Sequence, residues 1–332
     1  MIYGKIVFLC LLGEIMLDEL VFRTSPSTEK NLDELSVLQT REEERRLLEL
    51  YDVAEAAAVL ARELIAEGLG ICEALSVISD GVSLGDYPIH SLALSESRER
   101  LSGYISLLAQ ADRAELSLLF VSECQRLGIS ITERELLRTF EGEETFIYMR
   151  NQFADEAYDV FSQEFDNPRV RYAQSFSECV RAVAEGEVRF CLLPLEERGG
   201  TRLPTVSELV LRNDLKINAV SPVFGFDGTA NLKYALLSRD FVIPEINEGD
   251  DAYLEIRLGS DGDNLSSTLN AAGLFGMSVY RVDTVIADTE GESESYFTVV
   301  LRDGGTGFAP MLVFLALFVE DHSTQGYYKN LE

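Results

Sequence analysis

The stretch of sequence that decides the fold is residues 176–217, which read FSECVRAVAEGEVRFCLLPLEERGGTRLPTVSELVLRNDLKI. Its first part predicts a short helix, because Ser175 and Glu178 form a capping-box pair at the start and Gly186 is a stop signal at the end. The apolar residues of this helix recur at helical spacing and share one face: Phe176, Val180, Val183 and Ala184.

A buried strand and a second helix follow in the same stretch. The apolar run Val188–Leu195 has the composition of a strand that is covered on both faces. After a Gly-Gly pair, Thr205 and Glu208 predict the capped start of the second helix. Helix, strand, Gly-rich loop and helix is the order of a parallel α/β layer, in which ligands gather at loops leaving the carboxyl ends of the strands. We therefore expect a binding loop at Glu196–Leu203.

Neighbouring segments extend this α/β layer over residues 143–240. Upstream, the pattern predicts a helix at Phe153–Phe165 between strands at Phe146–Met149 and Val170–Tyr172. Downstream, it predicts further strands at Ile217–Val220 and Lys233–Leu237.

Residues 250–332 form a separate predicted domain of the α+β class. Its elements are expected in the order strand, helix, strand, strand, helix, strand, which is the ferredoxin-like arrangement. The predicted ranges are Tyr253–Leu258, Asp263–Ala272, Val279–Asp288, Ser295–Arg302, Phe308–Val319 and a last strand near Tyr327.

Residues 1–142 are predicted to form a mainly helical N-terminal domain. Helices are expected at Glu42–Glu67, Ser95–Leu108 and Ala111–Leu127, with a short fourth helix capped by Thr132 and Glu135 and a polar loop at Thr24–Glu34. The apolar segment Ile6–Leu12 resembles the start of a signal peptide. Because acidic residues soon follow and no small-residue cleavage site is evident, we predict a strand or a buried helix start instead.

Composition excludes several classes of function. The 332-residue chain has a formal charge of -29, which argues against nucleic acid and anionic membranes as partners. Its five cysteines are scattered without a Cys-x-x-Cys pair and it has two histidines, so we predict no disulfide framework, no metal site and no cofactor. No apolar run approaches the roughly 20 residues of a membrane span. We expect a cytoplasmic protein.

Several short motifs together resemble the first lobe of prephenate dehydratase, a periplasmic-binding-like α/β lobe. That family has an aromatic-x-acid-x-x-x-Ala-Val helix, a Gly-Glu approach to a strand, and a Pro-(Ile/Leu)-Glu-Asn-Ser loop. This chain has the corresponding residues in the same order: Phe176, Glu178, Ala182-Val183, Gly186-Glu187 and Pro194-Leu195-Glu196. The C-terminal unit resembles the ACT regulatory domain that follows the dehydratase lobes. The helical N-terminal part resembles the layout of a fused chorismate mutase–prephenate dehydratase.

The chain departs from the family at the residues that carry its chemistry. Asn231-Leu232-Lys233-Tyr234 stands where the family has Asn-x-Thr-Arg-(Phe/Tyr), so the family's proton-donating threonine falls on Leu232, which has no proton to give. The family also places a second lobe before this strand, and Asn218–Asn231 is too short for one. The resemblance therefore implies that dehydratase catalysis is lost, and we predict no catalytic residue.

The candidate ligand-binding residues lie in the loop after the buried strand and in the Asn231–Tyr234 segment. An arginine there would bind a small organic acid in bidentate fashion, whereas the alternative is a solvated, salt-bridged surface loop. The candidates are Glu196, Arg198, Thr201, Arg202, Asn231 and Lys233. In the ACT-like unit, the positions that match the family's regulatory motifs are Asn264, Leu265, Asp283 and Thr284.

Three hypotheses for function follow. The first is a prephenate dehydratase relative without dehydratase activity, which binds a small carboxylate or amino acid in a regulatory role as a homodimer through its ACT-like sheet. The second is an active bifunctional chorismate mutase/prephenate dehydratase, which needs basic side chains from at least two N-terminal helices around one cavity. The third is that the N-terminal helices are a dimerisation or docking module.

Overall fold

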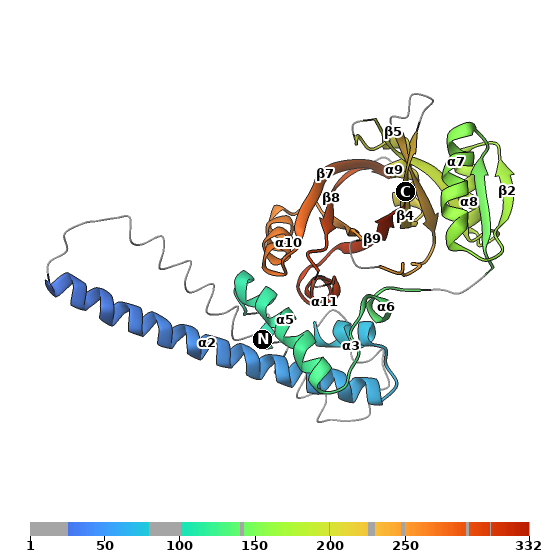
Figure 1. Ribbon diagram of the computed structural model, residues 1–332. Helices are drawn as coiled ribbons and strands as arrows, with labels where there is room; N and C mark the ends of the chain where they lie inside the picture. Colours follow the sequence, from blue (N-terminus) through green and yellow to red (C-terminus); the bar gives the residue numbers. More distant parts are fainter. Residues whose placement is uncertain are drawn as a thin grey trace. The chain divides into compact units, whose positions relative to one another are not determined.

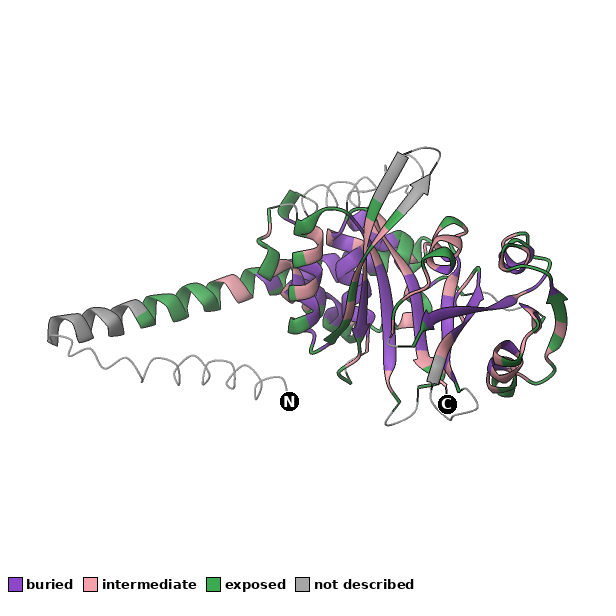
Figure 2. Ribbon diagram, turned by 90° about the horizontal axis from the view of Figure 1, so that it is seen from above, coloured by how far each residue is buried: buried purple, intermediate pink, exposed green. Residues whose placement is uncertain are grey.

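The computed structural model describes residues 26–79, 101, 103–105, 107–139, 143–198, 200–224, 230–246, 250–289, 292–305 and 307–331. The chain divides into two compact units, Met1–Glu49 and Leu50–Glu332. In the described part of the first unit, residues 36–45 of the long helix α2 are exposed, and they are drawn green in Figure 2. No helix among the described residues is long and apolar enough to cross a membrane.

Helices precede the strands and are interspersed among them along the chain (Figure 1). The helices are α2 (Pro26–Ala66), α3 (Ile71–Ile78), α5 (Gln110–Arg126), α6 (Glu133–Leu136), α7 (Gln152–Phe161), the 3-10 turn η2 (Ser162–Glu164), α8 (Phe176–Ala184), α9 (Pro204–Arg212), α10 (Gly262–Leu274) and α11 (Ala309–Phe318). The strands are β1 (Thr145–Met149), β2 (Arg169–Ala173), β3 (Phe190–Glu197), β4 (Lys216–Phe224), β5 (Ala230–Ser238), β6 (Ala252–Gly259), β7 (Ser278–Thr289), β8 (Glu292–Arg302) and β9 (His322–Asn330).

The nine strands found among the described residues belong to one mixed sheet in the order β2-β1-β3-β5-β4-β9-β6-β8-β7. Strands β2, β1 and β3 are parallel, as expected for the α/β layer, and β5 is antiparallel to both β3 and β4. Strand β4 pairs in parallel with β9, and this pairing joins the α/β part to the C-terminal strands. The sequence did not predict this continuous sheet.

Local sequence signals explain the helices of the α/β part. The Asn151 side chain caps α7 by accepting hydrogen bonds from the Phe153 and Ala154 amides, and Ser175 caps α8 by accepting one from Glu178. The cap predicted at Thr205 is wrong: α9 begins one residue earlier, at Pro204, and its N-cap residue Leu203 has no side-chain hydrogen bond. Proline suits the first turn because its missing N–H would have no partner there.

The C-terminal elements follow the predicted βαββαβ order. Their strands lie as β9-β6-β8-β7, with every neighbouring pair antiparallel. Helix α11 is apolar on all sides, and eight of its ten residues are buried. Its side chains contribute to two cores, because Met311 and Phe314 join the core beneath the sheet while Val313 and Leu317 join the core of the helical part.

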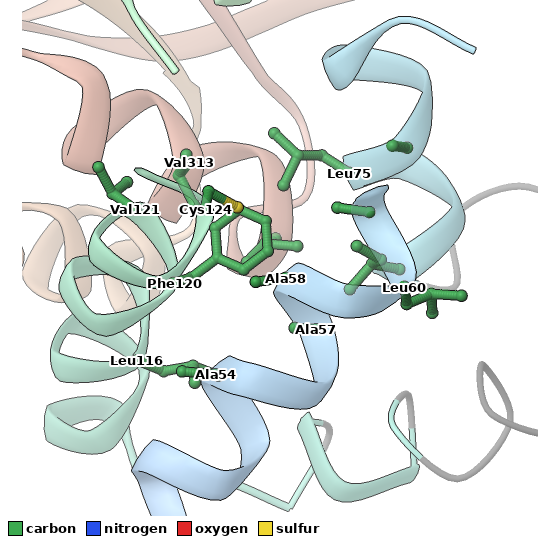
Figure 3. Packing of buried hydrophobic residues seen from close by; sticks show 14 of the residues in the cluster. Ala54, Ala57, Ala58, Leu60, Leu75, Leu116, Phe120, Val121, Cys124 and Val313 are labelled. Atoms are coloured by element: carbon green, nitrogen blue, oxygen red, sulfur yellow. The ribbon is translucent and has the colours of Figure 1, made fainter. Parts of the chain in front are cut away.

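The helical part packs its apolar side chains around α11 (Figure 3). Ala54, Ala57 and Ala58 of α2 recur at helical spacing and face Leu116 and Phe120 of α5. The predicted helices at Glu42–Glu67 and Ala111–Leu127 are therefore confirmed, as is the Thr132–Glu135 capping box.

One N-terminal expectation is wrong, and two others fall wholly or mostly on residues that the structure does not describe. The predicted loop at Thr24–Glu34 is wrong over its described part, since α2 already begins at Pro26. The apolar segment Ile6–Leu12, and most of the predicted helix Ser95–Leu108, lie outside the described residues.

The sheet curls, so that its last strand returns to the α/β part. Figure 1 shows β5, β4, β9 and β7 arranged around a curve. The Lys233 ammonium group of β5 lies 5.9 Å from the ring centre of Tyr280 on β7, although four strands separate β5 from β7 in the sheet order. Helices α8 and α9 contribute to one core with side chains of β3, β4, β6 and β9.

Candidate functional site

The loop after β3 turns back on itself and brings Arg202 beside Glu196. The Glu197 amide donates a hydrogen bond to the Thr201 carbonyl (2.9 Å), and Glu196 and Arg202 form an isolated antiparallel bridge. Gly200 lies in the left-handed region at φ +83°, where glycine carries no steric penalty. The tight turn therefore places Arg202 opposite Glu196.

Glu196 is the centre of a group of buried charges. Its carboxylate side chain is 6 % exposed and contacts three cations: Arg281 Nη1 at 2.9 Å, Lys233 Nζ at 3.3 Å and Arg202 Nε at 3.4 Å. Lys233 faces Glu196 across the β3–β5 pair, while Arg281 comes from β7. A buried carboxylate needs such partners, because burial without them is very costly.

Arg202 also binds a second buried carboxylate, that of Glu255 on β6. Its Nη2 lies 2.5 Å from Glu255 Oε2, and the Glu255 side chain is 6 % exposed. Burial lowers the pKa of Arg202, but Glu255, Tyr328 and Glu196 together outweigh it, so the pKa is raised and the guanidinium stays charged. Burial and then Glu255 raise the pKa of Tyr328, whose hydroxyl donates to Glu255 over 3.4 Å.

Arg281 connects the loop to β7. Its Nη1 donates to the Gly200 carbonyl at 2.8 Å as well as to Glu196, and its Nε lies 2.7 Å from Asp283 Oδ2. We call the six charged residues of this group the ion cluster. They are Glu196, Arg202, Lys233, Glu255, Arg281 and Asp283, and their formal charges balance.

Several donors of the ion cluster remain without a hydrogen bond. Arg202 Nε, Arg281 Nε and Arg281 Nη2 are buried, and none of them hydrogen-bonds within the described part of the chain. The two Nε atoms do lie within ion-pair distance of carboxylates, but without hydrogen-bond geometry, so we treat those contacts as electrostatic only. Buried N–H groups normally have a partner in the protein, in water or in a ligand.

A pocket of about 590 Å³ borders the ion cluster. Helix α9 and strands β7 and β8 each contribute lining residues. The lining residues are Leu195, Gly200, Thr201, Arg202, Pro204, Ser207, Val210, Leu211, Ile217, Glu255, Asp283, Thr284, Val285, Ile286, Thr298 and Gln325.

The structure brings together some of the predicted site residues. Glu196, Arg202, Lys233 and Asp283 belong to the ion cluster, and Thr201 and Thr284 line the pocket. The predicted residues thus come from two segments that the sequence treated as separate sites.

The other predicted residues lie elsewhere. Arg198 is exposed in the turn, and Asn231 is placed here only by its backbone in β5. Asn264 donates to the Glu320 carbonyl over 3.4 Å, and Leu265 packs against the core beneath α10, so neither lines the pocket.

Sequence reasoning missed Glu255 and Arg281. One signal for Arg281 was present, because Arg281 and Asp283 alternate on a predicted strand and so share a face. Glu255 alternates with Arg257 on the predicted strand Tyr253–Leu258 in the same way, so the sequence carried a comparable signal for Glu255. Within the described ranges, no group of three potential metal-ligating side chains is present.

Leu232 lies on the opposite side of β5 from Lys233. It packs against the cluster that contains Phe146, Tyr148 and Tyr234, away from the ion cluster. Strands β4 and β5 are joined by residues 225–229 alone, which leaves no room for a second lobe between them.

The comparisons with known proteins concern the fold alone. No family model and no curated protein match the chain. A solved structure described as GqqA, a novel type of quorum quenching acylase, shares 20 % identity, covering 57 % of this chain and 96 % of its own, at TM-score 0.41. Prephenate dehydratase from Streptococcus mutans shares 12 %, covering 57 % and 99 %, at TM-score 0.44. That from Arthrobacter aurescens, solved with L-Phe, shares 12 %, covering 55 % and 89 %, at TM-score 0.39.

Proposed function

We propose that this protein binds a small carboxylate or amino acid in the pocket beside the ion cluster and serves a regulatory role. The observation that carries the proposal is the guanidinium group of Arg202, which lines the pocket and whose Nε lacks a hydrogen bond within the described part of the chain. A ligand carboxylate accepts charge-assisted hydrogen bonds from such groups, and arginine matches its planar geometry.

The protein is, in this proposal, a divergent cytoplasmic relative of prephenate dehydratase. Residues 1–142 form its helical domain, residues 143–240 its dehydratase-like lobe and residues 250–332 its ACT-like domain. The support is the set of motifs in the lobe and the βαββαβ order of the C-terminal elements.

The same proposal includes a homodimer formed through the ACT-like sheet. Strand β7 lies at the edge of the sheet, and its side chains Val279, Val282 and Ile286 are 45 %, 40 % and 70 % exposed. A long edge strand with exposed apolar side chains is a template for pairing with another chain.

Dehydratase catalysis is not part of the proposal. Leu232 has no ionisable proton and lies on the other side of the strand from the ion cluster. The C-terminal sheet, and not a second lobe, faces the loop after β3.

The bifunctional alternative lacks support from the helical part. A chorismate mutase needs basic side chains from different helices around a cavity that binds a dicarboxylate. In the described helices, the core is made of Leu, Ala, Ile, Val, Phe and Cys side chains. Arg126 instead pairs with the buried Glu123 (2.6 Å) and with the exposed Glu55 (2.7 Å).

A thermal-shift screen of the full chain tests the proposal. The ligands are prephenate, chorismate, phenylalanine, tyrosine and tryptophan, and a ligand that binds only the folded form raises the melting temperature. We expect at least one to do so, and Arg202→Met to abolish the shift while Arg198→Met preserves it. A flat response to every ligand contradicts binding, and formation of phenylpyruvate from prephenate contradicts the loss of dehydratase activity.

A further inference from the structure

Strand β7 lies against the α/β part without contributing to an apolar core. Its ladder partner among the described strands is β8, and its other edge makes no backbone pairing with any of them. None of the side chains described in β7 is buried, and none belongs to one of the apolar cores. Because apolar burial is the dominant force that holds elements together, the position of this strand depends on other contacts.

The contacts between β7 and the loop after β3 centre on Arg281. Its Nη1 donates to Glu196 Oε1 at 2.9 Å and to the Gly200 carbonyl at 2.8 Å. Asp283, two residues further along the strand, holds the Nε of the same guanidinium at 2.7 Å. Arg281 therefore ties the edge strand to the loop that leads into α9.

Both strands are bulged where these side chains leave them. The ladder of β7 shifts register between Val279 and Arg281, and that of β3 shifts between Pro194 and Glu196. A β-bulge turns the side chains beside it out of the regular alternation, and bulges are common next to functional sites. The two bulges thus aim Arg281 and Glu196 at each other across the curl of the sheet.

This contact is weakly held for its size. Arg281 Nε, Arg281 Nη2 and Glu196 Oε2 are buried without a hydrogen bond in the described part of the chain, and water can satisfy them once β7 moves away. A buried ion pair gives little net stability, because the desolvation of both charges opposes their attraction. Separation of β7 from the loop therefore costs much less than separation of an apolar seam.

We infer that Arg281 is a latch: it holds β7 beside the loop, and its release opens the pocket between β7 and α9. Residues 283–286 of β7 line that pocket together with Val210 and Leu211 of α9. The latch regulates access to the pocket, and this regulatory role rests on the proposed function. The opening itself needs no ligand, so the latch can fail while ligand binding holds.

Thiol labelling of the full chain with iodoacetamide tests the latch. Val210→Cys places a thiol of similar size at a position that is 5 % exposed and lines the pocket. The natural Cys124 and Cys191 are buried in the cores and report global unfolding in the same sample. Peptide mass spectrometry follows the three positions separately.

We expect Arg281→Met to raise the labelling rate at position 210 at least about 10-fold, because it removes charge-assisted hydrogen bonds that hold β7. The rates at Cys124 and Cys191 should not rise with it. The matched control is Arg302→Met on β8, whose ion pair with Asp251 (2.6 Å) lies outside the pocket lining, and this variant should leave the rate at position 210 unchanged. An unchanged rate at position 210 in Arg281→Met overturns the latch, and so does an equal rise at all three positions.

A milder variant keeps the test decisive if Arg281→Met does not give a folded chain. Asp283→Asn removes the carboxylate that orients Arg281, at a side chain that is 37 % exposed. We expect it to raise the labelling rate at position 210 about 3-fold, as for the loss of a partly exposed ion pair. No rise at position 210 in this variant also overturns the latch.

Discussion

At the scale of single residues, the two neighbouring glutamates at the end of β3 have opposite surroundings. Glu196 is buried among three cations, whereas Glu197 is exposed. The cause is the alternation of side chains along a strand, which directs adjacent residues to opposite faces. The pair therefore provides a matched test of the ion cluster.

We predict that Glu196→Gln destabilises the protein by about 3–5 kcal/mol, because it leaves buried arginines without their shared carboxylate. Glu197→Gln is expected to change the free energy of unfolding by no more than about 0.5 kcal/mol. Denaturant titration of both variants measures the difference. Similar stabilities for the two variants would mean that the ion cluster contributes little to folding.

A second residue-scale prediction concerns His322 at the start of β9. Burial lowers its pKa, and its Nδ1 donates to the Val319 carbonyl at 2.6 Å. Because the unfolded chain binds the proton more tightly, the stabilising effect of neutral His322 is present above about pH 6.5 and is lost as the pH falls towards the lower folded-state pKa.

His322→Gln should therefore flatten the dependence of unfolding free energy on pH just below pH 6.5. Measuring that free energy between pH 5 and pH 8 for both proteins checks this. If the free energy of unfolding of the variant depends on pH as steeply as that of the wild type, other groups cause the loss of stability at low pH.

At the scale of elements, the β4–β9 pair depends on a glycine. A Cβ on Gly326 would lie 3.0 Å from two Tyr328 ring atoms and 3.1 Å from Ile217 Cβ, in the same pair of strands. This close approach lets the C-terminal strands continue the sheet of the α/β part.

We predict that Gly326→Ala destabilises the protein by about 1–3 kcal/mol through overpacking. The control is Gly273→Ala in α10, where a Cβ would meet nothing within 4 Å and alanine should stabilise the helix by up to about 1 kcal/mol. Thermal unfolding of the two variants should shift in opposite directions. A neutral Gly326→Ala would show that Tyr328 moves aside without cost.

At the scale of the whole molecule, helix α11 connects the helical part to the C-terminal sheet. Val313 and Leu317 pack among α2, α3 and α5, whereas Met311 and Phe314 pack beneath the sheet. A helix that is apolar on all sides must be covered on all sides. The helical part therefore buries the apolar side chains of α11 that the C-terminal sheet leaves uncovered.

Two truncations follow from this arrangement. Removal of residues 1–49 leaves the unit Leu50–Glu332. We expect the melting temperature of this unit to stay within a few degrees of that of the full chain, because the free energy of unfolding should change by less than about 1 kcal/mol. Removal of residues 1–140 exposes α11, and we expect aggregation instead of a folded monomer. Calorimetry and size-exclusion chromatography measure both, and a soluble, cooperatively folding chain after the longer truncation would contradict a shared core.

The sequence determined those features that depend on neighbours in the chain. The capped helix α8, the buried strand β3 and the βαββαβ order were predicted because caps, turns and periodicity act within a few residues. The loop after β3 was predicted as a binding loop for the same reason.

Only the tertiary structure decided what that loop faces. Arg202 meets Glu255 across 53 positions of sequence, and Arg281 meets Glu196 across 85. No local pattern encodes such contacts, because they depend on β9 pairing with β4 and on the curl that brings β7 back to the loop. The ion cluster therefore combines four residues that the sequence predicted with two that it did not. Its buried charges are stable only because distant strands supply the opposite charges.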